Sequence, residues 1–245
     1  MDYQAIFKRY ELKYIITSEQ RKRLLEIMRE YTEADRYPLS TVRNIYFDTD
    51  SFRLIRRSID SPKYKEKLRM RSYSRIEDNG RVFVEIKKKY NGVVYKRRLA
   101  MPERDAMEWI CGLPSLCGTQ IEREISYFKD FYAPLHPKVF LSYDREAYYS
   151  VIDNGVRITF DSNILARCDR LSLSCDVGGQ ALLDRGLYLM EIKSPSAIPL
   201  WLTHALSREK IYKTPFSKYG TAYRKHIFNE LKENNNYGLT VSRNF

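Results

Sequence analysis

The sequence is poor in cysteine, histidine and tryptophan, and it has no long apolar run. Its 245 residues include 4 Cys, 3 His and 2 Trp. No two cysteines form a CxxC pair, so a structural zinc site is not expected. No apolar segment approaches the ~18 residues of a membrane-spanning helix, and the opening MDYQAIFKRY lacks the apolar core of a signal peptide. We therefore expect reduced cysteines and a cytoplasmic location.

Negative charge is also in short supply. The chain has 43 Lys and Arg against 31 Asp and Glu, a formal net charge of +12. Such an excess attracts polyanions, which include nucleic acid, an anionic membrane surface and phosphorylated small molecules. Because 43% of the residues are hydrophobic and 13% are aromatic, this is a folding sequence and not a basic disordered tail.

Charged and apolar residues alternate at period two in several segments, which is typical of strands with two different faces. Strands are expected over 7–15, 42–48, 66–74, 81–89, 93–100, 139–149, 155–161 and 187–193. Asn91-Gly92 predicts a tight hairpin. Helices are expected over 18–31, after Pro102, and near 119–132, 199–208 and 217–233; Thr17 with Gln20 predicts a capping box for the first. The sequence has no repeat or linker, so one domain over 1–245 is expected, with a frayed tail after about 234.

The charged faces of these strands are biased towards Lys and Arg, as in KLRMR at 67–71 and EIKKK at 85–89. A solvated face over an apolar core explains alternation on any one strand. An ordinary solvated face mixes charge signs, however, because like charges side by side repel. If these faces pointed into a barrel, about ten cations would line it, which is tolerable only around a densely charged anion. The predicted fold is therefore α+β: an eight-stranded β-barrel with a basic interior and an apolar outer wall jacketed by helices.

Eight short segments occur in the order typical of one family: RYELKY at 9–14, YFDT at 46–49, KLRMR at 67–71, EIKKK at 85–89, YDR at 143–145, RITFD at 157–161, MEIK at 190–193 and SKYG at 217–220. Together they resemble the VTC domain, the catalytic module of the vacuolar transporter chaperone polyphosphate polymerases, within the triphosphate tunnel metalloenzymes. The resemblance implies an eight-stranded antiparallel β-barrel tunnel that binds ATP and triphosphate or inorganic polyphosphate with Mn²⁺ or Mg²⁺. It also implies transfer of the γ-phosphate of ATP onto a growing polyphosphate chain.

The resemblance assigns roles to individual residues. Phosphate-contacting catalytic residues are expected at Lys13, Arg69, Arg71, Lys87, Arg145, Arg157, Lys193 and Lys218. Further substrate contacts are expected from Arg9, Lys67, Lys89, Tyr143 and Ser217, and from Lys96 or Arg98, of which the inward-facing one is not identified. Ser217 and Lys218 are expected to close one tunnel end. Glu191 is expected to hold the metal. Glu11 and Glu85 are expected either to join the metal site through water or to orient basic neighbours. For Glu85 the orienting role is favoured.

The sequence departs from many superfamily relatives at Arg9, where they carry the first Glu of a Glu-x-Glu-x-Lys strand. A missing carboxylate disfavours metal-dependent hydrolysis and favours the polymerase.

Two alternatives stay open: a tripolyphosphatase or nucleoside triphosphatase on the same barrel, and a non-catalytic polyphosphate-binding module. A nucleic-acid partner is not expected, because a closed bore excludes a duplex and no RNP-like signature is present. The fungal proteins also carry an SPX domain and membrane spans, which this sequence lacks. Its regulation is therefore expected to differ, and any attachment to the inner face of a membrane is expected to need a separate membrane protein.

Overall fold

The computed structural model describes residues 10–77, 79–114 and 118–227. Its strands are β1 (Tyr10–Thr17), β2 (Thr32–Asp48), β3 (Tyr64–Ser72), β4 (Arg81–Tyr90), β5 (Val93–Pro102), β6 (His136–Ser150), β7 (Arg157–Arg167), β8 (Gln180–Ala181) and β9 (Leu187–Ser194). Its helices are α1 (Ser18–Met28), α2 (Arg53–Ile59), α3 (Glu103–Cys111), α4 (Gln120–Tyr132), α5 (Leu200–Arg208) and α6 (Lys218–Ala222), with a π-helix over Tyr223–Ile227.

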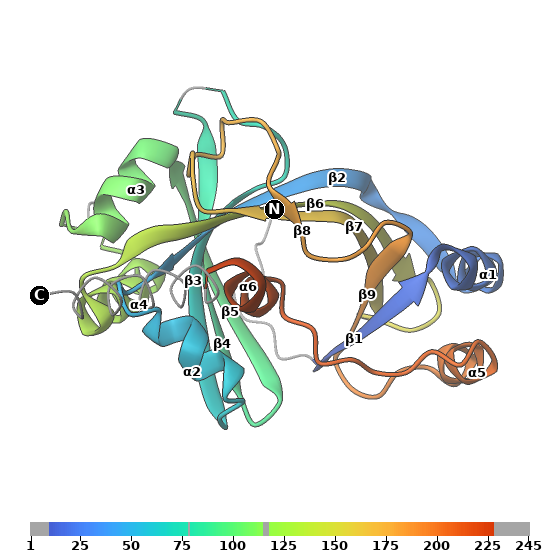
Figure 1. The fold of residues 1–245 in the computed structure, drawn as a ribbon. Coiled ribbons are helices and arrows are strands. Elements are labelled where there is room, and N and C mark those ends of the chain that lie inside the picture. The colour runs from blue at the N-terminus through green and yellow to red at the C-terminus, as the bar shows by residue number, and fades with distance from the viewer. Residues whose placement is uncertain (1–9, 78, 115–117, 228–245) are drawn as a thin grey trace, which may run out of the picture.

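The strands form one strongly curved sheet in the order β1-β9-β7-β6-β2-β3-β4-β5, with β8 paired to β7 (Figure 1). Every strand pair is antiparallel. The predicted α+β class is thus confirmed. Closure into an eight-stranded barrel is not, because no ladder joins β5 to β1 within the described ranges. Side chains span this opening instead: Lys87 Nζ of β4 donates to Glu11 Oε2 of β1 at 2.6 Å.

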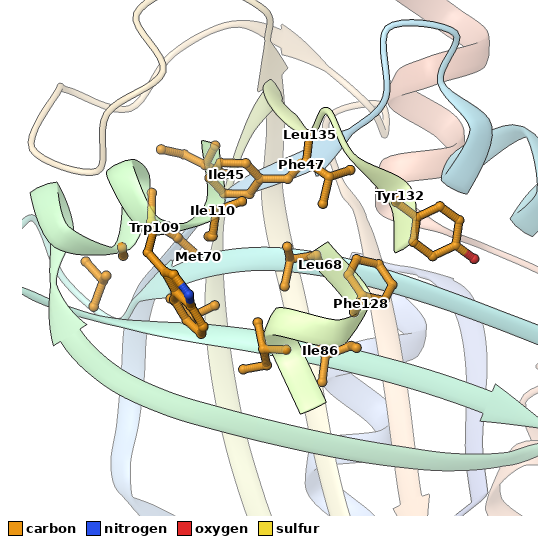
Figure 2. Close-up of a cluster of buried hydrophobic side chains, with 14 of the residues drawn as sticks. Ile45, Phe47, Leu68, Met70, Ile86, Trp109, Ile110, Phe128, Tyr132 and Leu135 are labelled. Atoms are coloured by element: carbon orange, nitrogen blue, oxygen red, sulfur yellow. The ribbon is translucent and has the colours of Figure 1, made fainter. Parts of the chain in front are cut away.

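Helices cover the outer face of the sheet in two groups (Figure 1). The helices α3 and α4 pack on β2, β3 and β4, and Figure 2 shows the buried cluster between them. The helices α1 and α5 pack on β1, β7 and β9 through a second cluster. Alternate strand residues such as Leu68, Met70 and Ile86 point into the first cluster and are fully buried. Burying a side chain of this size contributes about 1.5–3 kcal/mol, so the outer helices hold the curved sheet together.

The inner face differs from the prediction, because only part of it is polar. The helix α6 lies inside the curve of the sheet (Figure 1). It contributes Tyr219 and Ala222 to a third apolar cluster, together with Val42 of β2, Leu141 of β6 and Leu189 of β9. Near this end, β2 carries buried residues on both faces over positions 42–48. One end of the inner face is therefore filled by an apolar plug, and the charged residues occupy the rest.

Local sequence signals account for several element boundaries. Thr17 and Gln20 form the predicted capping box of α1, each side chain accepting the other residue's backbone N–H. Asn91 and Gly92, both at positive φ, make the two-residue turn that joins β4 to β5. The helix predicted near 217–233 begins as α6 at Lys218 and continues as the π-helix to Ile227, and positions beyond 227 lie outside the described residues.

Two features of the β2–α2 region were missed. The strand β2 begins at Thr32, ten positions before the predicted start at 42, and its pairing with β6 shifts register between Ala34 and Leu39. This irregularity interrupts the alternation that marks a strand. The seven-residue helix α2 has no side-chain cap at its N-cap residue, Phe52. Its first N–H groups are instead satisfied by the buried carboxylate of Asp48, which accepts from Leu54 and Ile55.

No helix in the described ranges is both long enough and apolar enough to cross a lipid bilayer.

Candidate functional site

The inner face of β3, β4 and β5 carries two rows of charged residues. Lys87 pairs with Lys67 on one side and Lys96 on the other, and Glu85 pairs likewise with Arg69 and Arg98. Directly paired residues point to the same face of a sheet. Both Lys96 and Arg98 therefore face inward, which settles the choice that the sequence left open. The signal was available, because a two-residue turn at Asn91-Gly92 fixes the register of the whole hairpin.

Glu85 is the centre of one charge cluster. Its side chain is fully buried and accepts from Arg69 Nε at 2.9 Å, with Arg71 Nε 3.8 Å away and Lys96 Nζ in direct contact. Burial by itself raises the pKa of this carboxyl, but the charges of Arg69, Arg71 and Lys96 outweigh it and hold the pKa far below the usual range. Glu85 is thus strongly stabilised as an anion and contacts three basic side chains. This position fits the orienting role considered for it.

Glu191 is the centre of a second cluster, on β9. Four basic side chains surround its carboxylate: Lys218 and Lys193 at 3.2 Å, Lys13 at 3.5 Å and Arg145 at 3.8 Å. Burial alone would raise the pKa of Glu191, but these cations, Lys218 and Lys13 foremost, hold it well below 4.5. The structure therefore brings together four residues predicted to contact phosphate and the one predicted to hold the metal.

Asp161 belongs to the same cluster and was missed as a site residue. It is fully buried on β7 and accepts two hydrogen bonds from Arg145, at 2.6 and 2.8 Å. It also accepts from Lys218 Nζ at 2.5 Å, which ties α6 to the sheet. Alternation along RITFD places Asp161 on the same face as Arg157 and Thr159, so its inward orientation was predictable. Its partner Lys218, 57 residues away, was not.

Lys67 has a different environment from the other inner cations. Within the described part of the chain it contacts no carboxylate, and its Nζ donates to Ser217 Oγ at 3.0 Å. Burial and the nearby charges of Lys13 and Lys87 lower the pKa of Lys67 well below 10.5. Ser217 also caps α6 by accepting from the Gly220 N–H at 3.1 Å. Lys67 therefore has no carboxylate partner among the described residues, and its surroundings disfavour its charged form.

Tyr143 lies between the two clusters. Its hydroxyl accepts from Arg71 Nη2 at 3.0 Å, and its ring lies under Lys218 Nζ at 4.4 Å and the Arg145 guanidinium at 5.0 Å. Cations over an aromatic face are attracted by its quadrupole. Tyr143 is nearly fully buried, so it holds these groups from behind.

The remaining predicted residues are spread around the same face. Arg157 is two-fifths exposed at the start of β7 and forms an ion pair with Asp35 at 2.7 Å. Arg98 lies over the Phe83 ring at 4.8 Å. The pKa of Lys89 is lowered, first by burial and then by the charges of Lys65 and Lys87. Arg9 lies outside the described residues.

Burial lowers the pKa of two inner lysines to values near neutral pH. The pKa of Lys96 is lowered to about 7, mainly by burial, although Glu85 opposes the shift. The pKa of Lys193 is lowered to about 8, again mainly by burial and against the attraction of Glu191. Glu11 behaves in the opposite way: burial raises its pKa, but Lys87 and other cations bring it to about 2. The fold thus disfavours the charged forms of Lys96 and Lys193, whereas it strongly stabilises Glu11 as an anion.

The carboxylates allow a simple test of whether a divalent metal fits. No group of three or more His, Cys, Asp or Glu side chains capable of holding a metal occurs in the described ranges. Glu191 and Glu11 lie on adjacent strands and interact electrostatically, whereas Glu85 belongs to a separate cluster. Mg²⁺ is commonly bound by one or two carboxylates together with phosphates of the substrate. The pair Glu191 and Glu11 fits this kind of site; Glu85 does not.

Fold and site together define a curved antiparallel sheet whose inner face holds two clusters of basic side chains around buried carboxylates. The fold is shared with a candidate adenylate cyclase from Bacillus halodurans, with a TM-score of 0.56 and 16% identity over 87% of this chain and 96% of that chain. It is also shared with a candidate adenylyl cyclase from Hippeastrum, whose reported dominant activity is that of a triphosphatase, with a TM-score of 0.54 and 15% identity over 88% and 95% of the two chains. Among curated proteins no similar sequence was found.

The family model of the VTC domain matches residues 8–227. The chain therefore belongs to the VTC domain family, as the ordered motifs predicted.

Proposed function

We propose that this protein is a metal-dependent polyphosphate polymerase, which transfers the γ-phosphate of ATP onto a growing polyphosphate chain on the inner face of its sheet. Phosphoryl transfer requires alignment of the reacting groups and neutralisation of charge on the phosphate oxygens, and little covalent chemistry from the protein. One arginine guanidinium can donate two parallel hydrogen bonds to the oxygens of a phosphate, and lysines supply mobile point charges. Arg69, Arg71 and Arg145 with Lys13 and Lys218 offer both kinds of contact.

One observation favours transfer to phosphate over transfer to water. The inner carboxylates Glu11, Glu85, Asp161 and Glu191 are all ion-paired, and each has a lowered pKa. A general base works best when its pKa lies near the operating pH, so these groups are poor bases for activating water. The end of a polyphosphate chain is already an anionic nucleophile and needs no base. The charge pairing therefore supports a polymerase.

Glu191 and Glu11 are the residues that would hold a divalent metal, Mn²⁺ or Mg²⁺. Such an ion would neutralise part of the negative charge of the substrate's phosphates. The four cations around Glu191 make this carboxylate a poor metal site in the absence of phosphate, because like charges would crowd together. We therefore propose that metal and phosphate bind together.

A hydrolase on the same fold is the second candidate. The structurally similar Hippeastrum protein, with a reported dominant triphosphatase activity, is the observation in its favour. The two reactions would use the same binding residues and differ in the acceptor, a phosphate chain or water.

The test is incubation of the purified protein with ATP and Mn²⁺, with products separated on a polyphosphate-stained gel. The matched control is Glu191→Gln, which keeps the side-chain shape and removes the charge at the centre of the second cluster. A ladder of long polyphosphate that the control does not produce supports the polymerase. Consumption of ATP or tripolyphosphate to orthophosphate alone would establish the hydrolase. Tight polyphosphate binding without turnover, retained in the control, would refute both and leave a binding module.

A further inference from the structure

Three polar atoms on neighbouring inner positions of β7 and β9 are buried and make no hydrogen bond within the described part of the chain. They are Thr159 Oγ1, Arg157 Nε and Lys193 Nζ. Arg157 pairs with Lys193 in the sheet, and Thr159 lies two positions along β7 from Arg157. Lys193 Nζ does have an ion-pair contact with Glu191, and Arg157 pairs with Asp35 through a different nitrogen. Thr159 has neither kind of compensation.

The surroundings of Thr159 explain why its hydroxyl lacks a partner. Its in-register neighbour on β6 is Ala147, which offers no polar side-chain atom. Its neighbour on β9 is Glu191, whose Oε1 contacts Lys13 and Lys218 and whose Oε2 contacts Lys193 and Arg145. Both carboxylate oxygens are therefore already engaged by cations.

An unpaired buried hydroxyl lowers the stability of a protein, since it loses its hydrogen bonds to water and gains nothing in return. Valine has nearly the same shape, suits a strand equally well and would avoid this penalty. A threonine with 0% exposure at this position is therefore unfavourable for the free fold. Such groups are explained when a ligand supplies the missing partner.

We propose that Thr159 is a substrate-contacting residue, whose hydroxyl donates a hydrogen bond to an oxygen of the bound phosphate chain. Arg157 and Lys193 complete this subsite as its charged donors. Thr159 is the uncharged member of this group and would fix the position of the phosphate by a directional hydrogen bond. The inference rests on the proposed function to the extent that the inner face binds a phosphate chain.

The experiment is calorimetric titration of the full chain with inorganic tripolyphosphate, together with thermal unfolding without ligand. The test variant is Thr159→Val, and Thr159→Ser is the conservative variant that keeps the hydroxyl. Thr159→Ala removes the hydroxyl without adding a second methyl group, in case valine disturbs the fold. Thr203→Val on α5 is the matched control, because it deletes a hydroxyl that donates to the Pro199 carbonyl at 3.1 Å outside the site.

We expect Thr159→Val to bind tripolyphosphate roughly 10-fold more weakly, the effect of one lost hydrogen bond to a charged group. We expect it to unfold at the same or a higher temperature than the natural chain. Thr159→Ser should keep most of the affinity, and Thr203→Val should keep all of it. Affinity within about twofold of the natural chain in both Thr159→Val and Thr159→Ala would overturn the inference and leave the proposed function intact. Failure of the natural chain itself to bind tripolyphosphate would overturn both.

Discussion

Removing the charge of Glu85 should destabilise the free protein strongly and should make its stability depend on phosphate. Glu85→Gln keeps the size of the side chain but leaves Arg69, Arg71 and Lys96 facing one another without a counter-charge. All three lie on the inner face, and the carboxylate between them is 0% exposed. A bound tripolyphosphate would restore the missing negative charge.

The magnitude follows from the burial. Breaking a buried ion pair by removing one partner costs about 3–5 kcal/mol, because the other charge is left buried and uncompensated. For a chain of this size each kcal/mol lowers the melting temperature by about 2–4 °C, so we expect a decrease of about 10 °C. Because the pKa of Glu85 is lowered in the fold, its contribution to stability is complete above pH 4.5. It is lost progressively as the pH falls below that value.

Thermal unfolding followed by circular dichroism, with and without tripolyphosphate, measures both effects. Asp176→Asn is the matched control, because Asp176 forms an exposed pair with Arg75 and such pairs contribute about 0–1 kcal/mol. We expect tripolyphosphate to raise the melting temperature of Glu85→Gln more than that of the natural chain. Glu85 does not compensate the inner cations if Glu85→Gln has the same melting temperature as the natural chain at pH 7. The same conclusion follows if tripolyphosphate raises the melting temperature of the variant no more than that of the natural chain.

Three further predictions concern the same face. Lys67→Met should raise the melting temperature without ligand, since it replaces a lysine whose charged form is disfavoured in the fold, and should weaken tripolyphosphate binding at least ~10-fold in calorimetry; a lower melting temperature would contradict this. Tripolyphosphate binding at pH 9 should take up protons, because Lys96 and Lys193, with pKa values of about 7 and 8, are largely neutral in the free protein and a bound anion favours their charged forms. At pH 6 these lysines are already charged, so titrations in buffers of different ionisation enthalpy should show that uptake at pH 9 only. Tyr219→Phe should lower the free energy of unfolding by about 1.5–3 kcal/mol in urea, since it deletes the buried hydrogen bond to Asp48 at 3.0 Å, and an unchanged midpoint would argue against that bond.

The sequence was most informative where the period-two pattern fixes the face of a strand. Alternation placed Lys13, Arg69, Glu85 and Glu191 on the charged faces of their strands, and the bias towards Lys and Arg with the family resemblance pointed those faces inward. These residues share the inner face in the structure. The placement of the helices outside the sheet was predicted from the same pattern, since the apolar strand faces needed cover. The family followed from eight motifs in order and is confirmed by the match to 8–227. A single domain over 1–245 stays a prediction.

The period-two alternation could not predict contacts between segments that are distant in the sequence. That Lys218 of the last described helix meets Asp161 depends on α6 turning into the curve of the sheet, and no local signal encodes that path. The apolar inner cluster was missed for the same reason, because Tyr219 and Ala222 join it only where α6 turns into the curve of the sheet. Sheet closure also depends on how strongly the strands coil, which alternation does not report.

The position of α6 has a consequence for the order in which the protein can be made. Lys13, near the start of the chain, donates from its Nζ to the Phe216 carbonyl at 2.9 Å, and its own carbonyl accepts from the Thr214 N–H at 2.8 Å. The first strand is thus held by a segment that leaves the ribosome about two hundred residues later. Until that segment emerges, the nascent sheet carries its crowded lysines and arginines without Lys218 in place between Asp161 and Glu191. The site is therefore complete only once α6 has been synthesised. A chain that stops before residue 213 would lack Lys218 and would expose an incomplete basic surface to surrounding polyanions.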